Sequence, residues 1–375
     1  PFTKLVLDPL DDSRINALTL LSKKDALMHI HFPVNQDRLK AARRRLVFDE
    51  FLVLQLGLLI RRSKYRSISA PVLVNLPTCE GLVGKFLDIL PFDLTNAQKR
   101  VLLEMQKDMS TSLPMARLLQ GDVGSGKTVV ALAGLIHCVQ SGLQGALMVP
   151  TEVLAEQHYR SFCKWLSQLH ITVELLTGST PKKKRKIILQ DLANGSLKIL
   201  LGTHALIEEP VIFSNLGLVV VDEQHRFGVK QRNRLLSKGL QPHLLAMTAT
   251  PIPRTLALSI HGDLDVSQLD ELPPGRIPIK TKLFSSSQRD KAYQIIRDQV
   301  ELGSKAYIVL PLVDESEKLD LRSAVEVHRN LTEDIFMDLN VRLLHGRMSS
   351  LDKNSVIREF SHGSCQILVS TTVIE

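Results

Sequence analysis

The sequence predicts an α/β protein with two parallel-sheet lobes, the second of them incomplete, preceded by a mainly helical segment. A glycine-rich loop at residues 121–128 lies between an apolar run and a helical stretch. Short apolar runs alternate with helical stretches from residue 93 onward, and a proline-glycine break at residues 270–276 separates two such series. Alternating strands and helices are typical of a parallel sheet covered by helices.

The glycine-rich loop has the pattern G-x-x-x-x-G-K-T, which binds phosphate when a strand precedes it and a helix follows. Its glycines let backbone N–H groups face phosphate oxygens, and the helix N-terminus adds partial positive charge. We expect Lys127 to reach the β- and γ-phosphates of a nucleotide and the Thr128 hydroxyl to bind Mg²⁺. The residues expected to hold the nucleotide are Gly121, Asp122, Val123, Gly124, Ser125, Gly126, Lys127 and Thr128.

Two acidic residues follow a second apolar run. Residues 218–221 have the pattern of a parallel strand buried on both faces, and they lead directly into Asp222 and Glu223. Ligands of open α/β sheets bind at the carboxyl ends of strands. We assign Asp222 to the metal ion and Glu223 to the general base that polarises the attacking water. An isolated acid pair after a strand is often only a solvated turn, so the phosphate loop is what favours catalysis.

A third strand is expected at residues 244–247, and the small hydroxyl residues Thr248 and Thr250 follow it. These hydroxyls are placed to bond the acid pair and to sense whether a γ-phosphate is present. The Thr-Ala-Thr motif alone is weak evidence for a nucleotide site, and its order and spacing after the acid pair strengthen that evidence.

The remaining elements follow from the same patterns. In the first lobe we expect strands at residues 118–120, 146–149, 173–176, 199–202, 218–221 and 244–247, and helices at 128–140, 153–169 and 254–261. In the second we expect strands at residues 279–284, 306–310, 341–344 and 366–370. The predicted division is 1–90 for the helical segment, 91–270 for the first lobe and 271–375 for the second.

Two basic stretches each have two interpretations. Residues 37–66 predict a long helix flanked by arginines, which is either a DNA-contacting lever or a packed helix with a solvated basic face. Residues 182–186 are Lys-Lys-Lys-Arg-Lys, which either contact phosphates or begin a solvated helix. Because charge runs are usually solvated, we favour the second interpretation for both.

Composition agrees with an aliphatic α/β core, since 44% of the residues are hydrophobic and only 5% aromatic. The net charge of +8 suits a polyanionic partner, although a basic soluble protein explains it equally well. The four cysteines have no C-x-x-C spacing and are expected to be reduced thiols. No apolar run approaches 18 residues, so we expect no membrane span.

These motifs resemble those of superfamily 2 helicases, and their amino-acid sequences are similar to those of the RecG family of bacterial branch-migration helicases. The resemblance rests on the glycine loop, on residues 222–229 and on residues 247–257, and it extends from about Leu94 to the last residue. It implies two RecA-like lobes of a P-loop helicase, with ATP and Mg²⁺ as cofactors. The implied activity is that of an ATP-dependent double-stranded DNA translocase acting on stalled forks and Holliday junctions. A monomer is expected, in the cytoplasm beside the nucleoid of a bacterium or in an organelle, with branched or duplex DNA and single-stranded DNA-binding protein as partners.

The resemblance also implies further site residues. Gln98 matches a glutamine that contacts adenine, and His225 closes the acidic motif and joins the catalytic residues. The residues that face DNA in the family correspond to Thr151, Thr203, His204, Arg254, His345, Arg347, Thr371 and Thr372.

Three other functions fit parts of the pattern. They are the motor of a transcription-repair coupling factor, an ATP-gated DNA-binding module without unwinding, and a small-molecule P-loop kinase, which would lack the second lobe. One departure from the family matters, because no Q-x-x-G-R-x-G-R segment occurs before Glu375. The arginine of that segment stabilises the transition state. The chain also begins with Pro1, so we expect a fragment that lacks the DNA-splitting wedge domain and hydrolyses ATP weakly.

Overall fold

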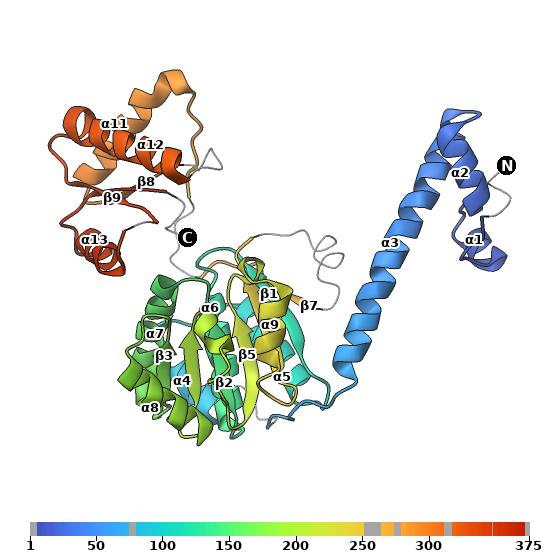
Figure 1. Cartoon of the computed structure of the whole chain (residues 1–375), viewed down its shortest axis with the longest axis horizontal. Coiled ribbons are helices and arrows are strands. Elements are labelled where there is room, and N and C mark those ends of the chain that lie inside the picture. The colour runs from blue at the N-terminus through green and yellow to red at the C-terminus, as the bar shows by residue number, and fades with distance from the viewer. Residues whose placement is uncertain are drawn as a thin grey trace. The chain divides into compact units, whose positions relative to one another are not determined.

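A seven-stranded parallel sheet lies at the centre of the first part of the chain, in the order β3-β4-β2-β5-β6-β1-β7 (Figure 1). The computed structural model describes residues 6–74, 80–250, 264–273, 279–310, 317–346 and 348–371. The strands of this sheet are β1 (Ala116–Gly121), β2 (Gln144–Met148), β3 (Val173–Leu176), β4 (Ile199–Gly202), β5 (Leu216–Val221), β6 (His243–Thr248) and β7 (Asp265–Leu269).

Helices cover both faces of the sheet because successive side chains of each strand point to opposite sides. Leu119 of β1 belongs to one buried cluster and its neighbour Leu118 to the other. The first cluster is covered by α4 (Gly81–Ile89), α5 (Asn96–Met109), α6 (Lys127–Gln140) and α7 (Glu152–Leu166). The second is covered by α8 (Lys182–Ala193) and α9 (Val229–Leu236). Short 3₁₀ turns occupy Ser167–Leu169, His204–Ile207 and Gln224–Arg226.

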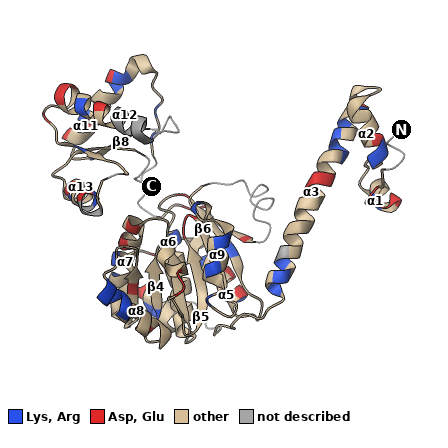
Figure 2. Cartoon of the chain, in the orientation of Figure 1, with Lys and Arg blue, Asp and Glu red and all other residues tan. Residues whose placement is uncertain are grey.

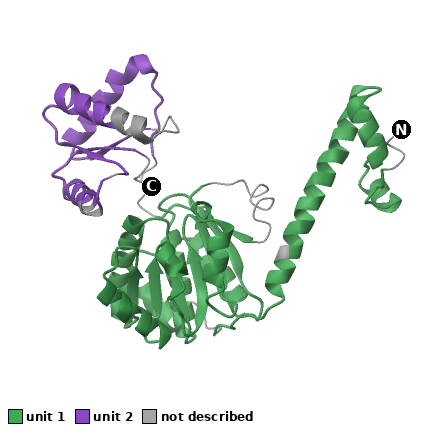
Figure 3. Cartoon of the chain, in the orientation of Figure 1, with its two compact units in different colours: residues 1–276 green, residues 277–375 purple. Residues whose placement is uncertain are grey.

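A second, smaller unit begins at residue 277 (Figure 3). Its three parallel strands have the order β8-β10-β9. Their bounds are β8 (Ala306–Val309), β9 (Val341–Leu344) and β10 (Ile367–Ser370), and the helices are α11 (Arg289–Glu301), α12 (Glu317–Asn330) and α13 (Ser350–His362). A 3₁₀ turn covers Ser286–Gln288 and a π-helical turn covers Leu331–Ile335. Val341 and Ile367 are buried in the core of this unit.

The predicted fold class of two parallel α/β lobes is confirmed, and nine of the predicted strands are present with small shifts at their ends. The strand predicted at residues 279–284 is wrong. Ile279 and Leu283 are 79% and 97% exposed, and no strand among the described residues pairs with this segment. The helix predicted at residues 254–261 lies outside the described residues. The division at residues 90 and 270 stays a prediction, since the first 90 residues fall within the first compact unit.

The N-terminal helices are α1 (Asp12–Ala17), α2 (Lys23–His31) and the 31-residue α3 (Gln36–Arg66). Lys and Arg gather near both ends of α3 and along α8 (Figure 2). The favoured interpretation of a solvated basic face is wrong for Arg45, whose side chain is fully buried. Its guanidinium donates to the carboxylates of Asp8 and Asp49, so this charge is paired within the N-terminal helices.

The middle of α3 exposes apolar side chains, including Phe51 at 51% and Val53 at 72% exposure. These values contradict a packed apolar face along the whole helix. Even so, no helix among the described residues is long and apolar enough to cross a membrane.

Residues 67–74, which follow α3, are held on the first lobe by two buried histidines. The Nδ1 atom of His243 accepts from the backbone N–H of Met115 at 3.0 Å, so this nitrogen carries no proton and Nε2 donates to the Pro71 carbonyl at 2.8 Å. His137 Nε2 likewise lies 2.8 Å from the Val74 carbonyl. Burial lowers the pKa of both imidazoles, so both are held in the neutral form.

We expect the free energy of unfolding to fall as the pH drops below about 6.5. The unfolded state binds protons on His137 and His243 that the folded state excludes, and each histidine can remove about 1.4 kcal/mol per pH unit in that range. Urea unfolding at pH 7.5 and 5.5 measures the effect, with His243→Gln as the variant and the exposed His362→Gln as the control. An equal loss of stability on acidification in the wild type and in His243→Gln would contradict this assignment.

Candidate nucleotide site

The phosphate loop leaves the carboxyl end of β1 and turns into the first residue of α6. Gly124 and Gly126 have φ angles of 77° and 86°, a region that favours glycine. A Cβ atom on Gly126 would lie 2.2 Å from Gln98 Nε2, so this position also needs glycine for space. The Val123 side chain is 67% exposed, whereas the Ser125 side chain is buried. The loop therefore has the backbone shape that the sequence predicts for a phosphate cradle.

Lys127 lies across the mouth of this loop. Its ammonium group donates to the carbonyl oxygens of Gly121 at 2.7 Å and Asp122 at 3.0 Å. An ammonium held at the start of a phosphate loop is placed to meet a phosphate anion. Thr128, the next residue, is half-buried at the start of α6.

Gln98 braces the phosphate loop from α5. Its side chain is 2% exposed and donates from Nε2 to the Ser125 carbonyl at 2.8 Å. Its Oε1 atom accepts from the Thr95 N–H at 2.9 Å, which completes a capping box at the start of α5. Both ends of the amide are thus engaged within the protein. The adenine contact that the resemblance implies stays a prediction.

The acid pair follows β5, where Asp222 is 7% exposed. Its Oδ2 atom lies 3.1 Å from His158 Nε2 on α7, and its Oδ1 atom accepts from the Glu223 N–H at 2.9 Å. Glu223 has a φ of 46°, which is uncommon for a residue other than glycine. Strained backbone of this kind is concentrated at functional sites, and here it directs the Glu223 carboxylate toward the neighbouring strand end.

The third motif joins the acid pair to the strand of the phosphate loop. Glu223 Oε2 lies 3.5 Å from the backbone N–H of Ala249, and Gln120 Nε2 donates to the Thr250 carbonyl at 3.3 Å. The hydroxyls of Thr248 and Thr250 are 2.8 Å apart. Since β6 lies between β5 and β1, two strand spacings, roughly 10 Å, separate the ends of the outer strands. A triphosphate and its metal ion fit across that distance.

The donors at this edge fit Mg²⁺. Hard oxygen ligands from one or two carboxylates, completed by phosphate oxygens and water, are the usual set for this ion. The Thr128 hydroxyl, after β1, and the Asp222 carboxylate, after β5, supply such oxygens from strands that are separated by β6. No cluster of three or more His, Cys, Asp or Glu side chains occurs among the described residues, so an all-protein metal cage is not the pattern in that part of the chain.

The residues predicted to face DNA differ in their exposure, and some of them lie outside the described residues. Thr151 caps α7, with its hydroxyl accepting from the Leu154 N–H at 3.3 Å, and His204 is exposed. Thr203 is 1% exposed, and its hydroxyl has no hydrogen-bond partner among the described residues. Thr371 is 7% exposed, so neither hydroxyl can contact DNA without becoming exposed. His345 is half-buried, and Arg254, Arg347 and Thr372 lie outside the described residues.

His158, the residue that contacts the Asp222 carboxylate, was not predicted from the sequence. It is 8% exposed on α7, 64 positions before Asp222. A single histidine on a helix carries no motif, so only the packing of α7 against the sheet identifies it. His225 was predicted to be catalytic, and its Nδ1 atom lies 3.5 Å from Glu223 Oε2.

Comparison with known proteins identifies the class. The DEAD/DEAH box helicase family matches residues 95–258, and the helicase conserved C-terminal domain matches residues 287–375. The ATP-dependent DNA helicase RecG of Synechocystis sp. is 53% identical over 98% of this chain, and RecG of Bacillus subtilis is 47% identical over 98%. A solved structure of RecG bound to a three-way DNA junction is similar over 99% of this chain, with a TM-score of 0.82 and 42% identity.

The matched domains are those of superfamily 2 helicases. Within that class the chain belongs to the RecG family, as its resemblance implied. The chain spans about half the length of the relatives it matches: 44% of the Synechocystis protein, 54% of the Bacillus protein and 48% of the chain in the junction complex.

Replacing Gln98 by alanine should weaken ATP and GTP binding by the same factor, about tenfold. The structure gives this amide a loop-bracing role, and losing a buried hydrogen bond costs about 1–3 kcal/mol. Fluorescence titration with each nucleotide measures the two affinities, and Lys99→Ala, an exposed neighbour on α5, is the control. A loss confined to ATP would instead support a contact with adenine.

Proposed function

We propose that this chain is the ATP-driven motor of a RecG-type helicase that translocates on double-stranded DNA and remodels branched DNA. One structural observation carries the proposal. The phosphate loop, the acid pair and the Thr-Ala-Thr segment follow the adjacent strands β1, β5 and β6 at one edge of a parallel sheet. Relatives named as RecG and the RecG structure with a three-way DNA junction support DNA as the partner.

Each residue of the proposed active site has a separate task. The backbone amides of the loop bind the β-phosphate, and Lys127 offsets the negative charge of the β- and γ-phosphates. Glu223 accepts a proton from the attacking water, and the Asp222 carboxylate, oriented by His158, faces the metal position. Bound Mg²⁺ would supply charge neutralisation on the phosphates, with the Thr128 hydroxyl as its protein ligand and Asp222 holding it through a water molecule.

Hydrolysis drives movement only if the DNA contacts differ between the nucleotide states. The Glu223 Oε2 atom lies 3.5 Å from the backbone N–H of Ala249, just after β6. A shift of Glu223 when the γ-phosphate is lost can therefore be passed to Ala249 and Thr250. Contacts to phosphates rather than to base edges suit a motor that must slide along any sequence. Thr151 and His204, at the ends of neighbouring strands, are the described candidates for such contacts. The proposal includes a monomer in the bacterial cytoplasm and single-stranded DNA-binding protein as a further partner.

Lys127→Ala should reduce ATP turnover below 1% of wild type, because the γ-phosphate loses its cation. Glu223→Gln should retain ATP affinity within about threefold and lose more than 99% of turnover, because an amide cannot accept the proton. Steady-state phosphate release and nucleotide titration measure the two quantities in the full-length protein. Near-normal turnover in Glu223→Gln would show that another residue is the base.

A three-way junction should stimulate ATP turnover by at least tenfold over the DNA-free protein and should be unwound. A linear duplex of equal length is the control substrate, and strand displacement is followed by fluorescence. Junction binding and ATP turnover without strand displacement would favour the alternative of an ATP-gated DNA-binding module.

A further inference from the structure

The C-terminal end of α3 is fastened to the first lobe by three side chains on one face of the helix. Arg62 and Arg66 both donate to the carboxylate of Asp265 on β7, at 2.6 Å and 2.9 Å. The Tyr65 hydroxyl donates to the Pro242 carbonyl at 3.1 Å, and Gln241 Nε2 donates to the Tyr65 carbonyl at 3.1 Å. Positions three and four apart share a helix face, so these contacts form one attachment.

This attachment is stronger than an isolated surface ion pair, which contributes about 0–1 kcal/mol. The Asp265 carboxylate holds two guanidinium groups. The side chains of Arg62, Arg66 and Asp265 are only 27%, 37% and 33% exposed. Without Asp265, two like charges four residues apart would face the lobe unpaired. Both arginines are occupied in holding the lobe, which argues against the lever interpretation in which they contact DNA.

The strand that receives α3 lies beside the strand of the phosphate loop. β7 pairs with β1 in parallel, with Asp265 opposite Arg117 and Leu269 opposite Gly121. Gly121 begins the phosphate loop, and Lys127 donates to its carbonyl. Four residues of one extended strand therefore separate the α3 attachment from the start of the loop.

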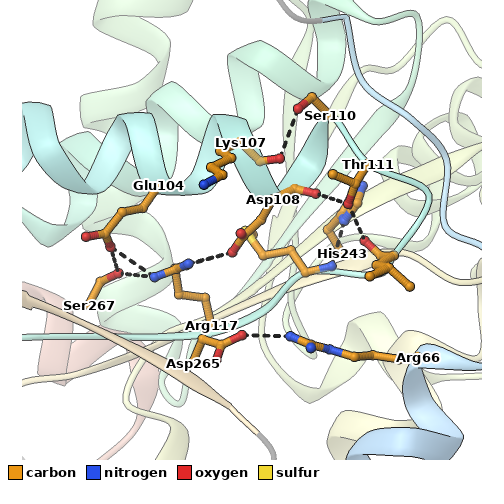
Figure 4. A network of polar contacts seen from close by, with 12 residues as sticks. Arg66, Glu104, Lys107, Asp108, Ser110, Thr111, Arg117, His243, Asp265 and Ser267 are labelled. Atoms are coloured by element: carbon orange, nitrogen blue, oxygen red, sulfur yellow. Dashed lines mark hydrogen bonds and ion pairs between the residues drawn. The ribbon is translucent and has the colours of Figure 1, made fainter.

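A second route runs through Arg117 and α5 (Figure 4). The Arg117 guanidinium, 11% exposed, donates to Glu104, Asp108 and Ser267 at 2.9, 2.6 and 2.7 Å. Glu104 and Asp108 belong to α5, whose first turn carries Gln98 and so braces the loop. Further along, Arg100 of α5 donates to the Gln268 carbonyl of β7 at 2.8 Å. β7, β1 and α5 are thus cross-linked by the buried Arg117 with its half-buried partners and by the more exposed Arg100.

We propose that Asp265 is a positioning residue that makes α3 a rigid extension of the phosphate-loop lobe. Movements of this lobe during the ATP cycle are then passed to α3 and to whatever the N-terminal helices carry. This inference rests on the proposed motor function, and its structural part can be tested without it. Asp265 begins β7, at the opposite end of the strand from Leu269, which pairs with Gly121 of the phosphate loop.

The structural part is tested by the distance distribution between spin labels at positions 40 on α3 and 183 on α8, in a variant without native cysteines whose urea unfolding matches that of the wild type. We expect a narrow distribution that Asp265→Asn broadens at least twofold. The charge exchange Asp265→Arg with Arg62→Glu and Arg66→Glu should restore it, and Arg43→Gln, an exposed arginine of α3, should leave it unchanged. An unaltered distribution in Asp265→Asn would overturn the proposal.

The functional part is tested by the number of base pairs unwound per ATP hydrolysed by the full-length protein on a three-way junction. Asp265→Asn should lower this ratio about fivefold while DNA-stimulated turnover stays within twofold, and the charge exchange should restore it. A parallel fall of turnover and unwinding would mean that Asp265 supports the lobe itself, which also overturns the proposal. If the wild type unwinds nothing, the motor function fails, and the spin-label distances still decide whether α3 is fixed.

Discussion

The parallel order β5-β6-β1 is the constraint on which the candidate site depends. The acid pair and the phosphate loop are about a hundred residues apart in sequence, and this strand order places them two strands apart at the same end of the sheet. Parallel strands place all their carboxyl ends on the same side, and the middle strand contributes the segment that bridges the other two. Any rearrangement that separated β1 from β6 would leave a phosphate loop without its acids.

Local geometry then shapes each part of the site. Gly126 must be glycine because of its left-handed backbone and because Gln98 occupies the space of a side chain. Glu223 accepts a strained backbone without being glycine. Strain at this residue is tolerated where the surrounding contacts hold it, as His225 and Ala249 do here. A switch that responds to a γ-phosphate needs such a poised element, because a relaxed loop would have no second arrangement to favour.

The sequence predicted the central strands well because their apolar runs are unambiguous. Residues 199–202 were located without error because β4 is an apolar run that is buried along its whole length. Residues 173–176 were also located without error, although β3 is a half-buried edge strand that contains Glu174. β7 was missed because Asp265, Ser267 and Gln268 interrupt that pattern, and their partners are Arg66, Arg117 and Gln120 from distant segments. The error at residues 279–284 has the opposite origin: an alternating pattern shows that a strand is permitted but not that a neighbouring strand is there to pair with it.

Site residues, like strands, could be predicted only where a local sequence pattern marks them. The phosphate loop and the acid pair have short-range signatures, so Lys127 and Asp222 could be named from sequence. His158 and the burial of Thr203 depend on how α7 and β4 pack, which no local pattern reports. Arg45 and Arg62 were interpreted as parts of a solvated face for the same reason, although each is paired with a carboxylate.

A crystal structure of the full-length protein with Mg²⁺ and a non-hydrolysable ATP analogue tests the shared site most directly. We expect one ion at about 2.1 Å from the Thr128 hydroxyl, with a water molecule linking it to Asp222. An ion bound away from Thr128, or an Asp222 carboxylate more than about 10 Å from it, would contradict the shared site, since one water molecule cannot bridge that distance.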